Sequence, residues 1–129
     1  MDFSYTEVQQ MLQDQVQKFV QKSYDFETRR KIVDGEAGYS AENWALFAEL
    51  GWLAVPFSEA DGGLGGSAVD LMVMMEEFGK ANVVEPFLPS AVLCGGLISR
   101  GRSENPAAGA NHDRPVATGL CLRGKRSPL

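Results

Sequence analysis

A glycine-rich segment followed directly by an apolar one most constrains the fold of this chain. Residues 58–67, "SEADGGLGGS", contain four glycines. Glycine permits backbone angles that other residues avoid, so this segment is predicted to be a loop. Ser67 is a suitable N-cap for the next residues, "AVDLMVMMEEFG", which are apolar on almost every side from Leu71 to Met75. A helix that is apolar nearly all round is buried, so we expect this one at the centre of a helical bundle.

Three further helices are predicted from their caps and spacing. Ser4 followed by Glu7 fits a capping box. The apolar residues after it recur on one helical face, namely Val8, Met11, Leu12, Val16, Phe19 and Val20. Ser40 is the expected cap of a second helix that ends at Gly51. The last helix is expected to begin near Ser90, with the sequence "AVLCGGLISR".

The segments between these helices are predicted to be connectors. Residues 24–40 mix charges and glycines, which indicates a short turn of helix and then a connector. Residues 52–57, "WLAVPF", are expected to be extended, because a proline biases the preceding residue away from helix. Gly95 and Gly96 each cost the last helix about 1 kcal/mol relative to alanine, which suggests that another backbone or a ligand comes close there. The predicted fold is all-α, a bundle of about four helices with an irregular C-terminal tail.

Length and charge narrow the class of protein. At 129 residues and 44% hydrophobic, the chain can bury one modest core, so a single small domain is expected. Residues 1–99 carry six Lys or Arg against fifteen Asp or Glu, and such an acidic surface gives no reason to expect nucleic acid. The N-terminus has no basic region followed by an apolar run, and no segment is as long as a membrane span. We therefore expect a cytoplasmic protein that binds neither nucleic acid nor membrane.

Few residues could carry chemistry by themselves. His112, Cys94 and Cys121 match no metal-binding spacing, and Cys94 lies in an apolar run that indicates a core position. Glu76 and Glu77 are adjacent on a helix, so their side chains point about 100° apart and cannot act together as acid and base. We expect this pair to be solvated or salt-bridged. The residues alone predict no catalytic, cofactor-binding or metal-binding side chain.

The glycine loop also fits a nucleotide-binding pattern. "GLGGSA", residues 63–68, matches G-x-G-x-x-A, and Glu85 follows at about the distance of the acidic residue in that pattern. In the dinucleotide fold, however, the first glycine follows a strand almost directly, whereas residues 56–62 intervene here. No convincing second strand follows. A dinucleotide-binding module is therefore a minor alternative.

Several short motifs occur in a characteristic order between residues 44 and 98. They are "ELGW" (49–52), Pro56, "GGLG" (62–65) and "EEFG" (76–79), followed by an apolar helix. In this order the motifs strongly resemble the N-terminal helical domain of acyl-CoA dehydrogenases. The resemblance covers residues 1–100 in outline, and these residues are expected to form that domain.

The resemblance implies a flavoprotein with a helical N-terminal domain, a middle β-domain and a C-terminal helical bundle. The family is homo-oligomeric, and its glutamate base removes an α-proton from an acyl-CoA while hydride passes from the β-carbon to FAD. That glutamate lies in the C-terminal bundle and most flavin contacts lie in the later domains, so neither catalysis nor FAD binding is expected from this chain alone. The N-terminal domain of the family forms part of the wall around the acyl chain. By analogy the candidates for this wall, with ordinary core as the plainer alternative, are Phe87, Leu88 and Val92.

Residues 101–129 are expected to form a separate tail. From residue 100 onward the chain carries six Lys or Arg against two Asp or Glu and has no hydrophobic period. The sequence also departs from the family pattern after about Ser103. Such a segment is expected to be disordered or translated out of frame.

A shift of reading frame would explain the tail. Read one base along, the codons for residues 111–125 permit "IMTGQWQLAYAYAEK", which looks like the next segment of the family. We therefore expect a frameshift between roughly Gly101 and Asn111. The alternative is a short helical interaction or subunit protein with a basic docking tail. In that case the residues expected to bind the partner are Arg123, Lys125 and Arg126.

Overall fold

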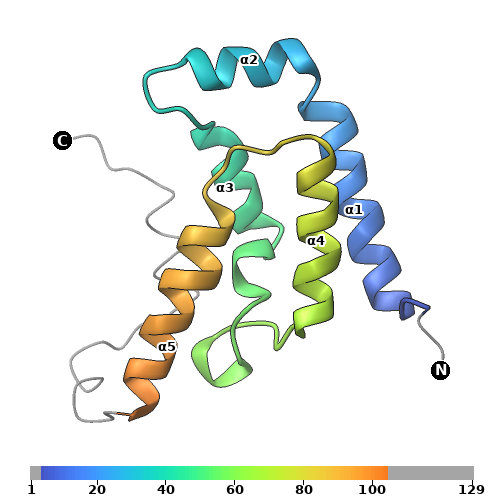
Figure 1. Cartoon of the computed structure of the whole chain (residues 1–129). Coiled ribbons are helices and arrows are strands. Elements are labelled where there is room, and N and C mark those ends of the chain that lie inside the picture. The colour runs from blue at the N-terminus through green and yellow to red at the C-terminus, as the bar shows by residue number, and fades with distance from the viewer. Residues whose placement is uncertain (1–3, 105–129) are drawn as a thin grey trace. The chain divides into compact units, whose positions relative to one another are not determined.

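The described part of the chain is helical throughout. The structure is a computed structural model that describes residues 4–104, with side chains as far as residue 101. These residues form five α-helices and no strand, which confirms the all-α prediction (Figure 1). The α-helices are α1 (Glu7–Ser23), α2 (Phe26–Asp34), α3 (Ala41–Glu49), α4 (Ala68–Lys80) and α5 (Gly95–Glu104). The shorter elements are the 3-10 helices η1 (Trp52–Ala54) and η2 (Glu59–Asp61) and the π-helix η3 (Leu88–Cys94).

The described residues divide into two compact units, each made from two stretches of chain. Residues 4–39 and 68–84 form the α1–α4 unit, which holds α1, α2 and α4. Residues 40–67 and 85–104 form the α3–α5 unit, which holds α3, α5 and the three shorter helices. Most of the predicted basic tail, including the region of the expected frameshift from residue 105 onward, lies outside the described residues.

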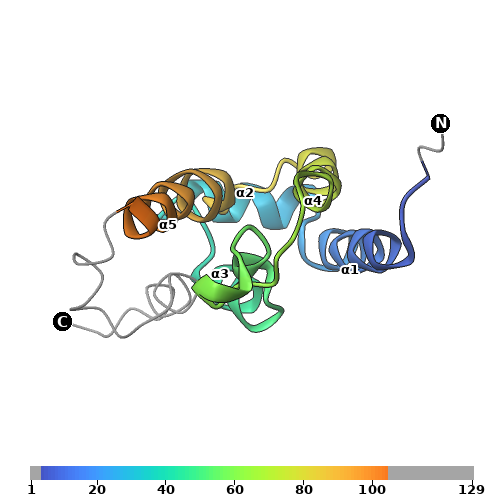
Figure 2. The ribbon, with the colours of Figure 1, turned by 90° about the horizontal axis from the view of Figure 1, so that it is seen from below.

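The α1–α4 unit is held together by two helices that lie side by side and run in the same direction (Figure 1, Figure 2). Val16 and Phe19 on α1 are buried, as are Val73, Met74 and Phe78 on α4. After α1, the hydroxyl of Tyr24 accepts a hydrogen bond of 3.1 Å from the N–H of Val84, beyond the end of α4. This hydrogen bond thus joins the segment that follows α1 to the segment that follows α4.

The N-terminus of α1 has a capping box two residues later than predicted. The Thr6 hydroxyl accepts from the N–H of Gln9 at 3.3 Å, and the Gln9 side chain accepts from the N–H of Thr6 at 3.0 Å. The sequence contains two overlapping box patterns, from Ser4 to Glu7 and from Thr6 to Gln9, and the prediction chose the wrong one. Thr6 has the extended backbone of a cap residue, so the helix begins at Glu7.

Replacement of Thr6 by alanine should destabilise the protein by about 1 kcal/mol, because the N–H of Gln9 loses its acceptor. Thr6→Ser keeps the hydroxyl and should retain most of the stability. Chemical denaturation of both variants measures the difference. Equal stabilities for the alanine and serine variants would contradict this assignment of the cap.

The connector predicted over residues 24–40 contains a complete helix, α2. Asp25 caps it by accepting a 3.0 Å hydrogen bond from the N–H of Thr28 and a 2.6 Å bond from the Thr28 hydroxyl. These hydrogen bonds to Thr28 lower the pKa of Asp25 because they favour the charged carboxylate. None of the residues of α2 is buried, which explains why this segment has no clear apolar period.

The α3–α5 unit begins with the predicted helix from Ser40. The Ser40 hydroxyl accepts a 3.2 Å hydrogen bond from the N–H of Asn43, and the helix ends before Gly51, whose φ of 76° is left-handed. Both predicted boundaries are confirmed. Aromatic rings then build the core of this unit: Phe47 lies 6.1 Å from Trp44 and 5.0 Å from Trp52, between ring centroids.

The prediction of an extended segment at residues 52–57 is wrong. The chain forms η1, and Val55 has helical angles of −53° and −45° in spite of the following proline. Successive tight turns are closed by hydrogen bonds from Ala54 to Gly51 and from Phe57 to Ala54. An extended segment would need a partner strand for its backbone hydrogen bonds, and the described residues contain none, whereas the turns supply these bonds locally. The turns also bury four side chains, namely Trp52, Leu53, Val55 and Phe57.

The helix predicted at the centre of a bundle, α4, is buried on one side only. Val73, Met74 and Phe78 are buried, but Met72 is 51% exposed and Val69 is also exposed. Continuous hydrophobicity therefore overstated the burial of this helix.

Candidate functional site

The glycine loop is a self-contained structural loop. Five successive backbone N–H groups in it are donated to carbonyl groups of residues 54–59; the donors are Gly62, Gly63, Leu64, Gly65 and Gly66. A Cβ at Gly66 would lie 2.7 Å from the carbonyl oxygen of Val55, and a Cβ at Gly63 would overlap the backbone of Phe57. Gly63 and Gly66 are therefore needed for the close approach of two backbone segments. A phosphate group would find none of these five N–H groups available.

Glu85, the acidic residue of the nucleotide-binding pattern, has a different role. Its side chain is 5% exposed. Its Oε1 atom accepts a hydrogen bond of 3.3 Å from the N–H of Ser40 and one of 3.2 Å from the side-chain amide of Asn43. The carboxylate thus lies at the N-terminus of α3, and neither part of the nucleotide-binding pattern is arranged for a nucleotide.

The segment after Glu85 contains the three candidates for the acyl-chain wall. It begins with a tight turn in which the N–H of Phe87 is donated to the carbonyl of Glu85 at 2.7 Å. Helical bonding then starts with Ser90 donating to Pro86 at 3.1 Å, because Pro89 has no N–H to contribute. The π-helix η3, Leu88–Cys94, begins two residues before the predicted start at Ser90. Short π-helical segments occur frequently at functional sites.

The three candidates lie in different environments along this segment. Phe87 is buried, Val92 is half-buried, and Leu88 is 44% exposed. Phe87 therefore belongs to the core of the α3–α5 unit, whereas Leu88 is open to contact. Further exposed apolar side chains follow Leu88 on the same pair of helices, η3 and α5: Leu93, Leu97 and Ile98.

One prediction for this helix is wrong. Cys94 is exposed and does not lie in the core. A π-helix has more residues per turn than an α-helix, so the positions that face the core differ from those of an α-helix. Here the buried positions are Ala91 and Gly95, and Cys94 faces outward. No backbone comes close at Gly96, where a Cβ would meet no described atom within 4 Å.

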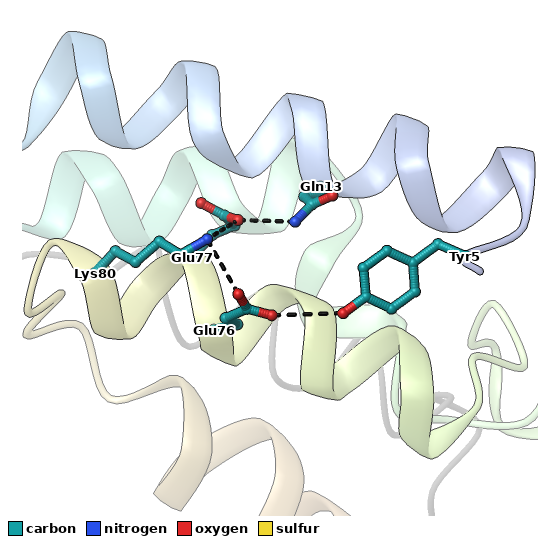
Figure 3. Close-up of polar contacts among 5 residues, drawn as sticks. All are labelled: Tyr5, Gln13, Glu76, Glu77 and Lys80. Atoms are coloured by element: carbon teal, nitrogen blue, oxygen red, sulfur yellow. Dashed lines mark hydrogen bonds and ion pairs between the residues drawn. The ribbon is translucent and has the colours of Figure 1, made fainter. Parts of the chain in front are cut away.

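The acidic pair on α4 belongs to a polar cluster in the α1–α4 unit (Figure 3). Lys80 joins the two carboxylates, with its Nζ 2.7 Å from Oε1 of Glu77 and 3.1 Å from Oε1 of Glu76. Gln13 on α1 donates to Glu77 at 3.0 Å, and the Tyr5 hydroxyl lies 3.5 Å from Glu76. Figure 3 shows that the two carboxylates share Lys80 and that each has a second partner of its own, Gln13 for Glu77 and Tyr5 for Glu76. The expected alternative of a salt-bridged pair is confirmed, and Glu77 is in addition buried, at 2% exposed.

The electrostatics of this cluster indicate a structural role. Burial raises the pKa of Glu77, but hydrogen bonds from Lys80 and Gln13 outweigh burial and lower that pKa below its ordinary value. The two carboxylates raise the pKa of Lys80. A carboxylate that is kept charged and hydrogen-bonded is a poor proton acceptor near neutral pH. The cluster therefore provides no general base.

Other kinds of site are also missing from residues 4–104. No three His, Cys, Asp or Glu side chains in this range converge so that they could hold a metal ion. None of the helices in the same range combines the length and the apolar character needed to cross a membrane.

Comparison with known proteins points to one family. The model of the acyl-CoA dehydrogenase N-terminal domain matches residues 6–105. Acyl-CoA dehydrogenase IpdE2 of Mycolicibacterium smegmatis is 35% identical over 100 residues, which are 77% of this chain and 32% of that protein. The probable acyl-CoA dehydrogenase YngJ of Bacillus subtilis is 32% identical over 81 residues, which are 63% of this chain and 21% of that protein.

A solved structure supports the same assignment. A chain of the ChsE4–ChsE5 complex from Mycobacterium tuberculosis superposes with a TM-score of 0.70 at 28% identity, covering 78% of this chain and 28% of that one. These comparisons confirm the resemblance inferred from the motif order. The chain spans about a third or less of the length of each of these proteins.

Proposed function

Because the chain belongs to the acyl-CoA dehydrogenase N-terminal domain family, we propose that it supplies part of the acyl-chain wall of an enzyme that oxidises a CH–CH bond of an acyl-CoA. The observation that carries this proposal is the match over residues 6–105, which includes the whole η3–α5 segment. The exposed apolar side chains of that segment have the chemistry to contact an acyl chain.

In this proposal the described residues contact the acyl chain of the substrate, and none of them takes part in the chemical reaction. In the family, a glutamate of the C-terminal bundle acts as the base, and bound FAD supplies the hydride acceptor. The glycine loop does not fit the pyrophosphate of FAD, because its backbone N–H groups are already donated within the loop. We therefore assign FAD to other domains of the complete enzyme, and we expect no catalysis from this chain alone.

The three wall candidates would act differently. Leu88 is exposed and would touch substrate carbon directly, and Val92, one turn along the π-helix, would contribute a partial surface. Phe87 is buried, so it would not touch the substrate but would fix the first turn of η3 by packing in the core. Exclusion of water by these side chains would favour binding of the acyl chain.

Assembly with other subunits is part of the proposal. The ChsE4–ChsE5 structure is a complex of two different proteins, and the family is expected to be oligomeric. We propose that the complete enzyme forms a homo-oligomer or a complex with a related subunit.

The proposed wall can be tested with the thiol of Cys94, which is exposed at the end of the π-helix. In a Cys121→Ser variant, octanoyl-CoA should slow alkylation of Cys94 by a maleimide, by about tenfold at ten times its dissociation constant. CoA without an acyl chain should protect much less.

Matched substitutions show whether protection comes from the wall. Leu88→Ser should weaken protection, whereas Met11→Ser, at an exposed apolar position of the α1–α4 unit, should leave it unchanged. Alkylation rates that do not respond to octanoyl-CoA would refute the proposed role of this segment.

A further inference from the structure

We propose that Glu85 is a positioning residue, which ties the start of the acyl-chain wall to the N-terminus of α3. This inference rests on the proposed function for its consequence in substrate binding. Its structural part, the coupling of two chain segments through one carboxylate, stands on the contacts of Glu85 alone.

Glu85 completes the cap of a helix that is 45 residues away in the sequence. In an ordinary capping box, the third residue of the helix returns a side chain to the N–H of the cap residue. Here the cap is Ser40 and the third residue is Asn43, which donates its side-chain amide to Glu85. The N–H of Ser40 is also donated to Glu85. Glu85 therefore accepts the hydrogen bond that a glutamate at position 43 would accept in an ordinary capping box.

The charge and burial of Glu85 suit this position. A carboxylate at a helix N-terminus interacts favourably with the helix dipole. Because the side chain is 5% exposed, its hydrogen bonds compete little with water. The carboxylate is therefore held in one place.

The backbone of the same residue fixes the wall. The carbonyl of Glu85 accepts from the N–H of Phe87 at 2.7 Å, and the next carbonyl, that of Pro86, accepts from Ser90 at 3.1 Å. The side chain of Glu85 thus holds α3, while its carbonyl sets the turn from which the π-helix starts. A shift of Glu85 would move Phe87 and Leu88 together.

Amide hydrogen exchange tests the structural part. Glu85→Ala should raise exchange about tenfold in peptides covering both residues 40–43 and residues 87–90, through local opening. Glu85→Gln keeps an acceptor oxygen and should restore most of the protection in both peptides. Glu77→Ala, which removes a buried carboxylate from the other unit, should raise exchange in α1 and α4 instead. Faster exchange at residues 40–43 alone would overturn the proposal.

Cys94 alkylation, in the Cys121→Ser background, tests the consequence for binding. Glu85→Ala should abolish the protection by octanoyl-CoA, and Glu85→Gln should retain it. If octanoyl-CoA does not protect Cys94 in the protein with Glu85 unchanged, the proposed function fails. The hydrogen-exchange result still shows whether Glu85 couples residues 40–43 to residues 87–90. If Glu85→Ala does not fold, Asn43→Ala removes one of the two side-chain hydrogen bonds and should give a smaller change in both peptides. Full octanoyl-CoA protection in a folded Glu85→Ala variant would refute the positioning role.

Discussion

Replacement of Gly63 by alanine is expected to destabilise the protein by about 3 kcal/mol, because a methyl group would overlap the backbone of Phe57. Backbone atoms cannot move aside as a flexible side chain can. The loop would have to separate from residues 54–57 and lose the hydrogen bonds that Leu64, Gly65 and Gly66 donate there. Urea denaturation followed by tryptophan fluorescence measures the loss, since Trp52 lies just before this contact.

Gly96 provides the matched control for this prediction. A Cβ there would meet no described atom within 4 Å, and Gly96 lies inside α5. Gly96→Ala should therefore stabilise the protein, by about 0.5–1 kcal/mol, because alanine loses less backbone entropy than glycine in a helix. Similar stabilities for Gly63→Ala and Gly96→Ala would contradict the close approach of the two backbones.

Features that depend on neighbouring residues could be predicted from the sequence. Ser40 and Gly51 mark the ends of α3 correctly, because a cap hydroxyl and a left-handed glycine act within a few residues. The family was also recognisable, since the order of its motifs survives in the chain. The 3-10 turn at Trp52 was missed because the proline rule is only a local bias, and burial of the aromatic side chains overrides it.

Features that depend on distant partners could not be predicted in this way. Glu77 and Glu85 are buried carboxylates whose partners come partly from positions 42–64 residues away, and no local pattern reveals such pairs. Cys94 was misplaced for a related reason. Its exposure depends on the π-helical turns before it, whereas the apolar run around it looks like an ordinary α-helix. For the candidate site, the sequence could name Phe87, Leu88 and Val92 but could not tell which of them is buried.

Removal of the Glu77 side chain is the second large effect that we expect. Glu77→Ala should destabilise the protein by about 2 kcal/mol, because the half-buried Gln13 loses its charged acceptor and the buried Glu77 side chain is removed. The cost is smaller than for a fully buried ion pair, since Lys80 is 53% exposed and keeps its contact with Glu76. Urea denaturation at neutral pH measures this loss. Glu76→Gln, at a half-exposed position on the same lysine, should cost much less.

The contribution of Glu77 should also depend on pH in a defined direction. Its folded pKa is lower than the ordinary value of 4.5, so the charged carboxylate favours the folded state. This stabilisation is complete above the unfolded pKa and is lost as the pH falls from there through the folded pKa. The stability difference between the unsubstituted protein and Glu77→Gln should therefore shrink as the pH falls through and below the ordinary pKa of 4.5. Asp25 titrates in the same direction but is present in both proteins, so its effect cancels. A difference that stays constant or grows on acidification would mean that Lys80 and Gln13 do not stabilise the charged form of Glu77.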